Sequence, residues 1–203
     1  MSIPLYYFIG IVSWPVVRLL FRLRTRGLQN IPDGGGFVLA SNHLSNFDPW
    51  ALGMPLWPRW RLRWMAKVEL FNPIFKPILL HGGAFPVRRG EQDTAAIRKA
   101  MADVRDGDVL VQCPEGTRRK KGLRKRHRPR AHTGTARIAL AAGVPLVPAA
   151  LSGTDRLSRL GPLRVAYGPP LTLDDLRDRE LKNAAEIATE RLMKAIRELE
   201  ASL

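Results

Sequence analysis

Short apolar runs that alternate with helical patterns constrain the fold of this chain more than any other feature. The candidate strands are residues 37–40, 60–64, 109–113, 145–151 and 163–167, and the candidate helices are 92–106, 135–142, 181–203 and one opened by Asp48-Pro49. Strands bounded by glycine and proline, with helices between them, are typical of layered α/β proteins. We therefore predict an α/β fold.

The chain is strongly basic, and one stretch carries much of the charge. Its 203 residues hold 33 Lys and Arg against 18 Asp and Glu, for a net charge of +15, and residues 118–130 alone hold nine basic side chains and no acid. Such an excess attracts nucleic acid, anionic membranes or anionic small molecules, and the charge alone does not indicate which of them is the partner. This stretch either holds anionic groups near a functional site or is a solvated loop.

Cysteine usage and the tryptophan-rich stretch allow narrower predictions. The single cysteine, Cys113, excludes an intrachain disulfide and a cysteine-ligated zinc site, and we expect it to be a buried small side chain at a strand end. Trp60, Leu62 and Trp64 alternate with two arginines, which predicts a half-buried strand whose arginines face outward.

The N-terminal segment is apolar enough to contact a membrane. Residues 1–17 carry no charge, the apolar character continues to Phe21, and three arginines follow within five residues. The segment lacks the flanking residues of a cleaved signal peptide. It could lie in the membrane interface, span a bilayer or form a core helix; its prolines, tyrosines and tryptophan favour the interface. We expect residues 1–24 to associate with a membrane whose cytoplasmic side the arginines mark, and residues 25–203 to form one domain.

A histidine and an aspartate follow the first buried strand, within residues 42–48. A histidine can take a proton from a hydroxyl group, and a carboxylate bonded to its Nδ1–H fixes the tautomer and stabilises the imidazolium. On one continuous helix His43 and Asp48 would point about 140° apart, so they can meet only if the residues between them turn. Asp48 before a proline is also a natural helix N-cap, and both roles can coexist.

A second polar segment, residues 113–118, follows another predicted strand. Gly116 would let the backbone approach a ligand closely, Thr117 offers a hydroxyl, and Arg118 can grip a phosphate with two hydrogen bonds. Glu115 suits the positioning of an arginine or a bond to a substrate alcohol. The segment could also be an ordinary turn.

Together these two motifs resemble motifs of the glycerolipid acyltransferase family, which includes 1-acylglycerol-3-phosphate acyltransferases. The four matching segments, in chain order, are residues 42–48, 83–88, 113–118 and 143–148. The resemblance implies a single-domain twisted mixed β-sheet flanked by helices. It also implies O-acyl transfer from acyl-CoA or acyl carrier protein (acyl-ACP) to the free hydroxyl of a lysophospholipid acceptor, foremost 1-acylglycerol-3-phosphate, which gives phosphatidic acid.

The resemblance also assigns roles to single residues. His43 is the general base, Asp48 orients it, and Arg88 with the segment Glu115, Gly116, Thr117 and Arg118 holds the glycerol phosphate of the acceptor. No metal and no cofactor beyond the acyl donor is expected. The expected partners are the two substrates and an anionic membrane surface, with no nucleic acid, and the expected place is peripheral or monotopic at the cytoplasmic face of the cell membrane.

Two other functions fit parts of the sequence. A basic protein without enzymatic activity could bind nucleic acid or an anionic membrane through residues 118–130. A serine hydrolase could use Ser41 or Ser45 with His43, although the chain has no Gly-x-Ser-x-Gly motif.

Overall fold

The computed structural model describes residues 3–88, 93–118 and 131–203. Its centre is a seven-stranded sheet in the order β1-β7-β6-β2-β5-β3-β4, and every neighbouring pair is parallel except β6 and β7. The strands are β1 (Arg24–Arg26), β2 (Phe37–Ser41), β3 (Leu62–Lys67), β4 (Ala84–Val87), β5 (Val109–Gln112), β6 (Leu146–Ser152) and β7 (Arg164–Tyr167). The sheet is mixed, as the sequence resemblance implies.

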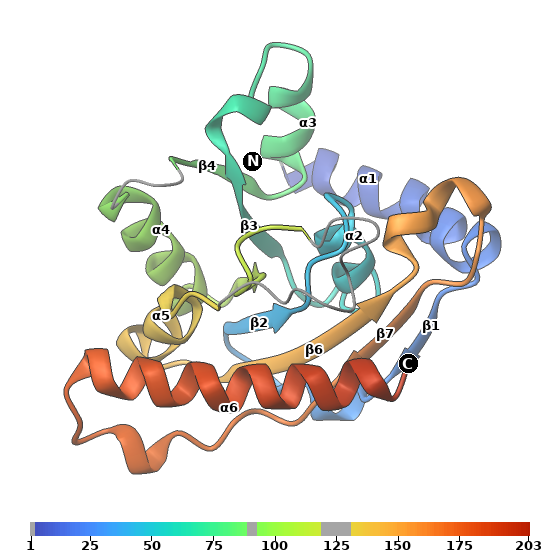
Figure 1. Ribbon diagram of the computed structural model, residues 1–203. Helices are drawn as coiled ribbons and strands as arrows, with labels where there is room; N and C mark the ends of the chain where they lie inside the picture. The colour runs from blue at the N-terminus through green and yellow to red at the C-terminus, as the bar shows by residue number, and fades with distance from the viewer. Residues whose placement is uncertain (1–2, 89–92, 119–130) are drawn as a thin grey trace.

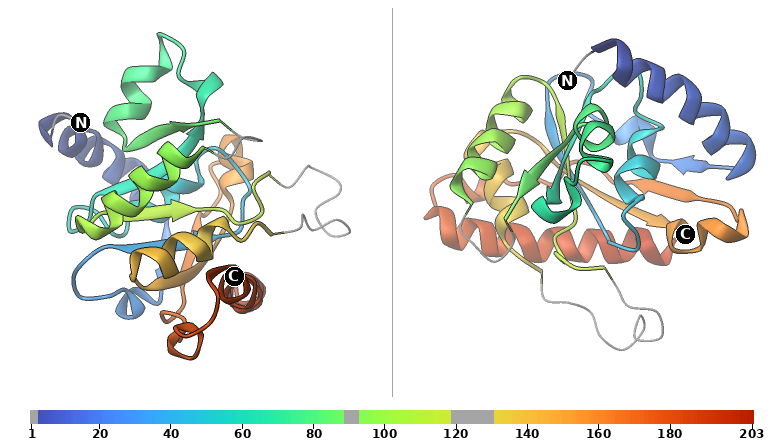
Figure 2. Two further views of the ribbon diagram at one scale, coloured as in Figure 1. Left: turned by 90° about the vertical axis from the view of Figure 1, so that its left-hand side faces the viewer. Right: turned by 90° about the horizontal axis from the view of Figure 1, so that it is seen from above.

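Helices cover both faces of this sheet (Figures 1 and 2). They are α1 (Ile3–Pro15), α2 (Asp48–Gly53), α3 (Phe75–His81), α4 (Thr94–Arg105), α5 (Gly134–Ala142) and α6 (Leu181–Ala201), with a π-helical turn at Val16–Leu20 after α1. Short 3-10 helices lie at Leu28–Asn30, Val68–Leu70, Thr154–Arg159 and Asp174–Leu176. The predicted helices agree with α4, α5 and α6 to within about two residues at each end, and the predicted start of a helix at Asp48 agrees with α2.

The two sides of the sheet bury alternate side chains, as the period of a strand requires. On β2, Val38 and Ala40 pack with α4, α5 and α6, while Phe37 and Leu39 pack with Leu52 of α2. These four side chains and that of Ser41, the last residue of β2, are fully buried. A strand buried on both faces reads as a continuous apolar run, which is why the sequence revealed it.

The N-terminal helix rests on the domain along one side only. Tyr6, Val17 and Phe21 are buried, but nine apolar side chains of the segment are exposed, so it is not the core helix that was one of its alternatives. Burial raises the pKa of the Tyr6 hydroxyl. The exposed apolar side chains of the segment are Leu5, Tyr7, Phe8, Ile11, Val12, Trp14, Val16, Leu19 and Leu20. Among the described residues, no helix has both the length and the apolar character needed to cross a bilayer.

The tryptophan-rich strand was predicted in part. Trp60 and Trp64 pack against the core, but β3 begins only at Leu62. The two arginines do not simply face water: Arg61 Nε lies 2.8 Å from Oδ1 of Asp108, and Arg63 Nε lies 2.7 Å from Oδ2 of the same carboxylate. Asp108 is buried, and a buried carboxylate needs charged partners. Both arginines therefore form ion pairs with Asp108 at the border of the core.

Candidate active site

The predicted site residues all follow strands that run in the same direction. β2, β5, β3 and β4 are mutually parallel, so their carboxyl ends meet at one edge of the sheet. His43 follows β2, Glu115 follows β5 and Arg88 follows β4. Ligands of open α/β sheets bind in the crevice outside the carboxyl ends of the strands. The sheet therefore gathers the three motifs where a substrate site is expected.

The histidine and the aspartate meet, because the residues between them turn. Nδ1 of His43 lies 2.7 Å from Oδ2 of Asp48, and the backbone N–H groups of Leu44 and Ser45 donate to the same oxygen at 2.7 and 2.9 Å. The other oxygen, Oδ1, accepts a hydrogen bond of 2.6 Å from the hydroxyl of Thr154. Four donors thus converge on one carboxylate.

Asp48 is not the helix N-cap that its place before a proline predicted. The N-cap position is taken by Phe47, and Asp48 is the first residue of α2. Its carboxylate turns back toward the loop instead of toward the N–H groups of its own helix. The turn of residues 43–48 is thereby tied to the carboxylate that the histidine uses.

This arrangement suits general base chemistry. Asp48 is fully buried, whereas the side chain of His43 is 12% exposed. With Nδ1–H donating to Asp48, the other ring nitrogen, Nε2, is left as a proton acceptor, and the buried carboxylate stabilises the imidazolium that forms.

Two residues that the sequence did not single out, Thr154 and Asn42, fix the loop of residues 42–48 to the end of β6. Thr154 follows β6 and bonds to Asp48 as described above. Asn42 lies in the loop, and its side-chain amide donates to the Leu151 carbonyl at 3.0 Å and accepts from the Leu151 N–H at 2.9 Å. Both Asn42 and Thr154 are buried. The only sequence feature that pointed to a role for Asn42 was its position next to His43 in the first motif. No sequence feature pointed to Thr154.

The segment after β5 lies next to the segment after β2, because the two strands are paired. Glu115 is buried, while Thr117 and Arg118 are exposed. Gly116 has a φ of +65°, and a Cβ there would lie 2.8 Å from Cδ2 of His132. The glycine is therefore required by its own backbone and by a neighbouring ring. Its role beside a ligand stays a prediction.

Cys113 lies beside the two catalytic candidates and is only partly buried, which corrects the expectation of a buried side chain. One ligand atom from each of His43, Asp48 and Cys113 lies within 4.8 Å of the others, a spacing that could hold a metal ion. Nδ1 of His43 and both oxygens of Asp48 are already engaged in the hydrogen bonds above. The donor set therefore fits a hydrogen-bonded pair better than a metal site.

Arg88 shares the edge of the sheet but lies to one side. β4 is separated from β2 by β5 and β3, which places it about 14 Å away at the usual strand spacing. The side chain is exposed at the border of a 390 Å³ cavity that Lys99 also lines. The Arg88 N–H donates to Asp93, and hydrogen bonds from Ala96 and then Arg88 lower the pKa of that carboxyl group.

The described residues offer little to the two other functions. Ser41 donates to the Asn42 carbonyl and Ser45 accepts from the Phe47 N–H, and within the described ranges neither serine hydrogen-bonds to His43. Of the basic stretch 118–130, only Arg118 is described; the rest lies outside the described residues.

The chain is similar to known acyltransferases. Residues 22–152 match the family model described as Acyltransferase. The chain is 31% identical over 179 residues to the 1-acyl-sn-glycerol-3-phosphate acyltransferase of Bacillus subtilis (strain 168), covering 86% of each protein. It is 28% identical over 145 residues to the chloroplastic 1-acyl-sn-glycerol-3-phosphate acyltransferase BAT2 of Brassica napus, covering 70% of this chain and 40% of that protein.

A solved structure shares the fold. The 1-acyl-sn-glycerophosphate (LPA) acyltransferase PlsC from Thermotoga maritima superposes with a TM-score of 0.65 at 21% identity, covering 97% of this chain and 78% of that one. The family match spans more than half of the chain, and the Bacillus relative exceeds 30% identity along most of it. This protein therefore belongs to the acyltransferase family and is a PlsC-like O-acyltransferase.

Proposed function

We propose that this protein transfers a fatty acyl group from acyl-CoA or acyl-ACP to the free hydroxyl of 1-acylglycerol-3-phosphate, which yields phosphatidic acid. The observation that carries the proposal is the pair formed by His43 and Asp48 at the carboxyl edge of the sheet. The acceptor is taken from the names of the two curated relatives.

The reaction follows from the two ends of the imidazole. Nε2 of His43 removes the proton from the acceptor hydroxyl as its oxygen attacks the thioester carbonyl, and Asp48 stabilises the imidazolium. The tetrahedral intermediate collapses by breaking the C–S bond. The imidazolium then returns its proton to the departing thiolate, which leaves as a thiol. The acyl group passes directly to the acceptor without an acyl-enzyme, and the route uses no metal and no further cofactor.

Substrate binding is assigned to the neighbouring strand ends. In this proposal Arg88 and the segment Glu115, Gly116, Thr117 and Arg118 hold the phosphate and glycerol of the acceptor. Arginine suits this role because its planar guanidinium can give a phosphate two parallel hydrogen bonds. The exposure of Arg88, Thr117 and Arg118 is consistent with binding a substrate that arrives from outside.

The N-terminal segment is proposed to bring the enzyme to its lipid. Residues 1–24 would lie in the interface at the cytoplasmic face of the cell membrane, with residues 25–203 as the acyltransferase domain. The exposed apolar row on α1 and the turn after it supports this, because exposed aromatic and aliphatic side chains on one segment suit an interface.

The test is acyl transfer by the purified protein. Labelled acyl-CoA and, separately, acyl-ACP are offered with 1-acylglycerol-3-phosphate, and the wild type is compared with His43→Ala and Asp48→Asn. Loss of the base should lower kcat by at least about 100-fold. Ser45→Ala is the matched variant: within residues 3–88, 93–118 and 131–203 its hydroxyl only accepts from the Phe47 N–H, so it should stay active. Undiminished product from His43→Ala would overturn the mechanism.

A further inference from the structure

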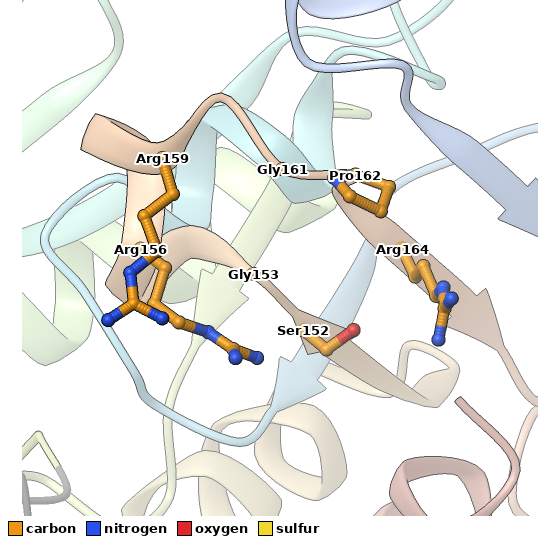
Figure 3. A pocket seen from close by; sticks show the side chains of 7 residues that line it. All are labelled: Ser152, Gly153, Arg156, Arg159, Gly161, Pro162 and Arg164. Carbon is orange, nitrogen blue, oxygen red and sulfur yellow. The ribbon is translucent and has the colours of Figure 1, made fainter.

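A cavity lined by arginines opens at the far side of the catalytic pair from Arg88. Its volume is 280 Å³, and its lining residues are Ser152, Gly153, Arg156, Arg159, Gly161, Pro162 and Arg164 (Figure 3). The end of β6, the following 3-10 helix and the start of β7 form its walls. Figure 3 shows Arg156 and Arg159 on one side of Ser152 and Arg164 on the other. None of the four sequence motifs includes these residues.

The lining is positively charged. Three of its seven lining residues are arginines and none is acidic. The side chain of Arg156 is 58% exposed, and its Nε lies 3.6 Å from the carboxylate of Asp155. Among the described residues this loose contact leaves its two terminal nitrogens for a ligand. Arg164 also donates to the Leu203 carbonyl. Ser152 adds a hydroxyl near the middle of the group (Figure 3).

The cavity and the catalytic pair are linked through consecutive residues of the chain. Gly153 lines it, and the next residue, Thr154, donates to Oδ1 of Asp48 at 2.6 Å. Gly153 makes this junction possible: its φ is +96°, and a Cβ there would lie 2.7 Å from the Pro162 carbonyl oxygen. The tight turn thus places Thr154 against the aspartate and starts the 3-10 helix that carries Arg156 and Arg159.

We propose that this cavity is a second phosphate subsite of the enzyme, which binds a phosphate group of one of its two substrates. The inference rests on the proposed function, in which the acceptor carries a phosphate monoester and acyl-CoA carries several phosphates. Guanidinium groups on two sides and a hydroxyl between them match the oxygens of a phosphate. The volume is below that of ordinary ligand pockets, so it suits a head group and not a whole nucleotide.

The position of the cavity separates it from the site assigned to Arg88. β6 and β4 lie on opposite sides of β2 in the sheet, and β2 carries the histidine. One phosphate cannot contact both. With the acceptor held by Arg88 and the segment after β5, the cavity takes a phosphate of the donor; with the roles exchanged, it takes the phosphate of the acceptor.

Kinetics of Arg159→Gln and Arg156→Gln test the subsite. KM for 1-acylglycerol-3-phosphate is measured at saturating acyl-CoA, and KM for acyl-CoA at saturating acceptor. We expect one of the two KM values to rise about tenfold, the loss of one hydrogen bond to a charged group, with kcat nearly unchanged. The substrate whose KM rises is the source of the phosphate. Arg179→Gln removes the same charge from an exposed position before α6 and should change neither KM.

A binding measurement separates this inference from the proposed function. Titration calorimetry with glycerol 3-phosphate and with CoA needs no turnover, and each variant should bind one of them about tenfold more weakly than wild type. A wild type that is inactive on 1-acylglycerol-3-phosphate but shows this arginine-dependent binding would remove the proposed function and keep the subsite. An active enzyme whose KM values and binding are unchanged in both variants would overturn the subsite.

Discussion

Replacing Thr154 with valine should damage the enzyme through the aspartate that the threonine holds. Thr154 is buried, its hydroxyl donates to Oδ1 of the fully buried Asp48 at 2.6 Å, and valine has nearly the same shape without the hydroxyl. Among the described residues Oδ1 accepts a hydrogen bond from Thr154 alone. A buried charged group that loses a donor costs about 1.5–3 kcal/mol, which in a chain of this size lowers Tm by about 3–12 °C.

Activity should fall as well, because only Oδ2 remains held. With Oδ1 unpaired, the carboxylate can rotate away from its contact with His43. A displacement of this kind costs up to about 100-fold in rate, so we expect kcat to fall about 10- to 100-fold. KM for both substrates should stay unchanged, because Thr154 does not line the arginine cavity. Steady-state kinetics with 1-acylglycerol-3-phosphate and thermal unfolding measure the two effects.

Thr154→Ser is the matched control for this prediction. Serine keeps the hydroxyl and loses one methyl group, which costs about 1 kcal/mol of stability. It should therefore melt below wild type yet keep a kcat close to the wild-type value. The reasoning is refuted by a valine variant whose kcat equals that of wild type, or by a serine variant that loses as much activity as the valine variant.

Three further predictions concern stability. Tyr167→Phe removes a buried hydroxyl that donates to the Leu52 carbonyl at 2.6 Å, and urea unfolding should show a loss of about 1–2 kcal/mol. Leu39→Ala empties a fully buried position of β2 and should cost about 2–5 kcal/mol in the same assay. The pKa of Asp93 is lower in the folded protein than in the unfolded chain. Its ionised carboxylate therefore stabilises the start of α4 at a pH above the unfolded-state pKa, and this stabilisation is lost as the pH falls through the folded-state pKa. Asp93→Ala should thus melt below wild type near neutral pH, and the difference should shrink below about pH 3.9.

The central strands were predictable because they are buried on both faces. Residues 37–40 and 109–113 became β2 and β5 with ends that differ by one residue. The edge strands were not. β1 is Arg-Thr-Arg, too short and polar to show a pattern, and β4 contains Pro86, which is typical of an edge strand but weakens a strand pattern.

The contact between His43 and Asp48 was predictable because it is local. The two are five positions apart in the sequence, and a turn is enough to bring them together. The bonds from Thr154 and Leu151 were not, because the partners are 106 and 109 positions apart in the sequence. They form because β6 is placed beside β2, and a list of strands does not specify their order in the sheet.

The same sheet order decides which motifs can act at one point. β2 has β6 on one side and β5 on the other, so segments from both reach the catalytic pair: Thr154 follows β6 and Cys113 follows β5. β4 precedes β5 in the chain but lies three strand spacings from β2. Distance from His43 therefore follows position in the sheet and not order in the sequence. Arg88, a motif residue, therefore lies farther from β2 in the sheet than Gly153, which belongs to no motif. For this reason phosphate contacts need to be tested on both sides of His43 and Asp48.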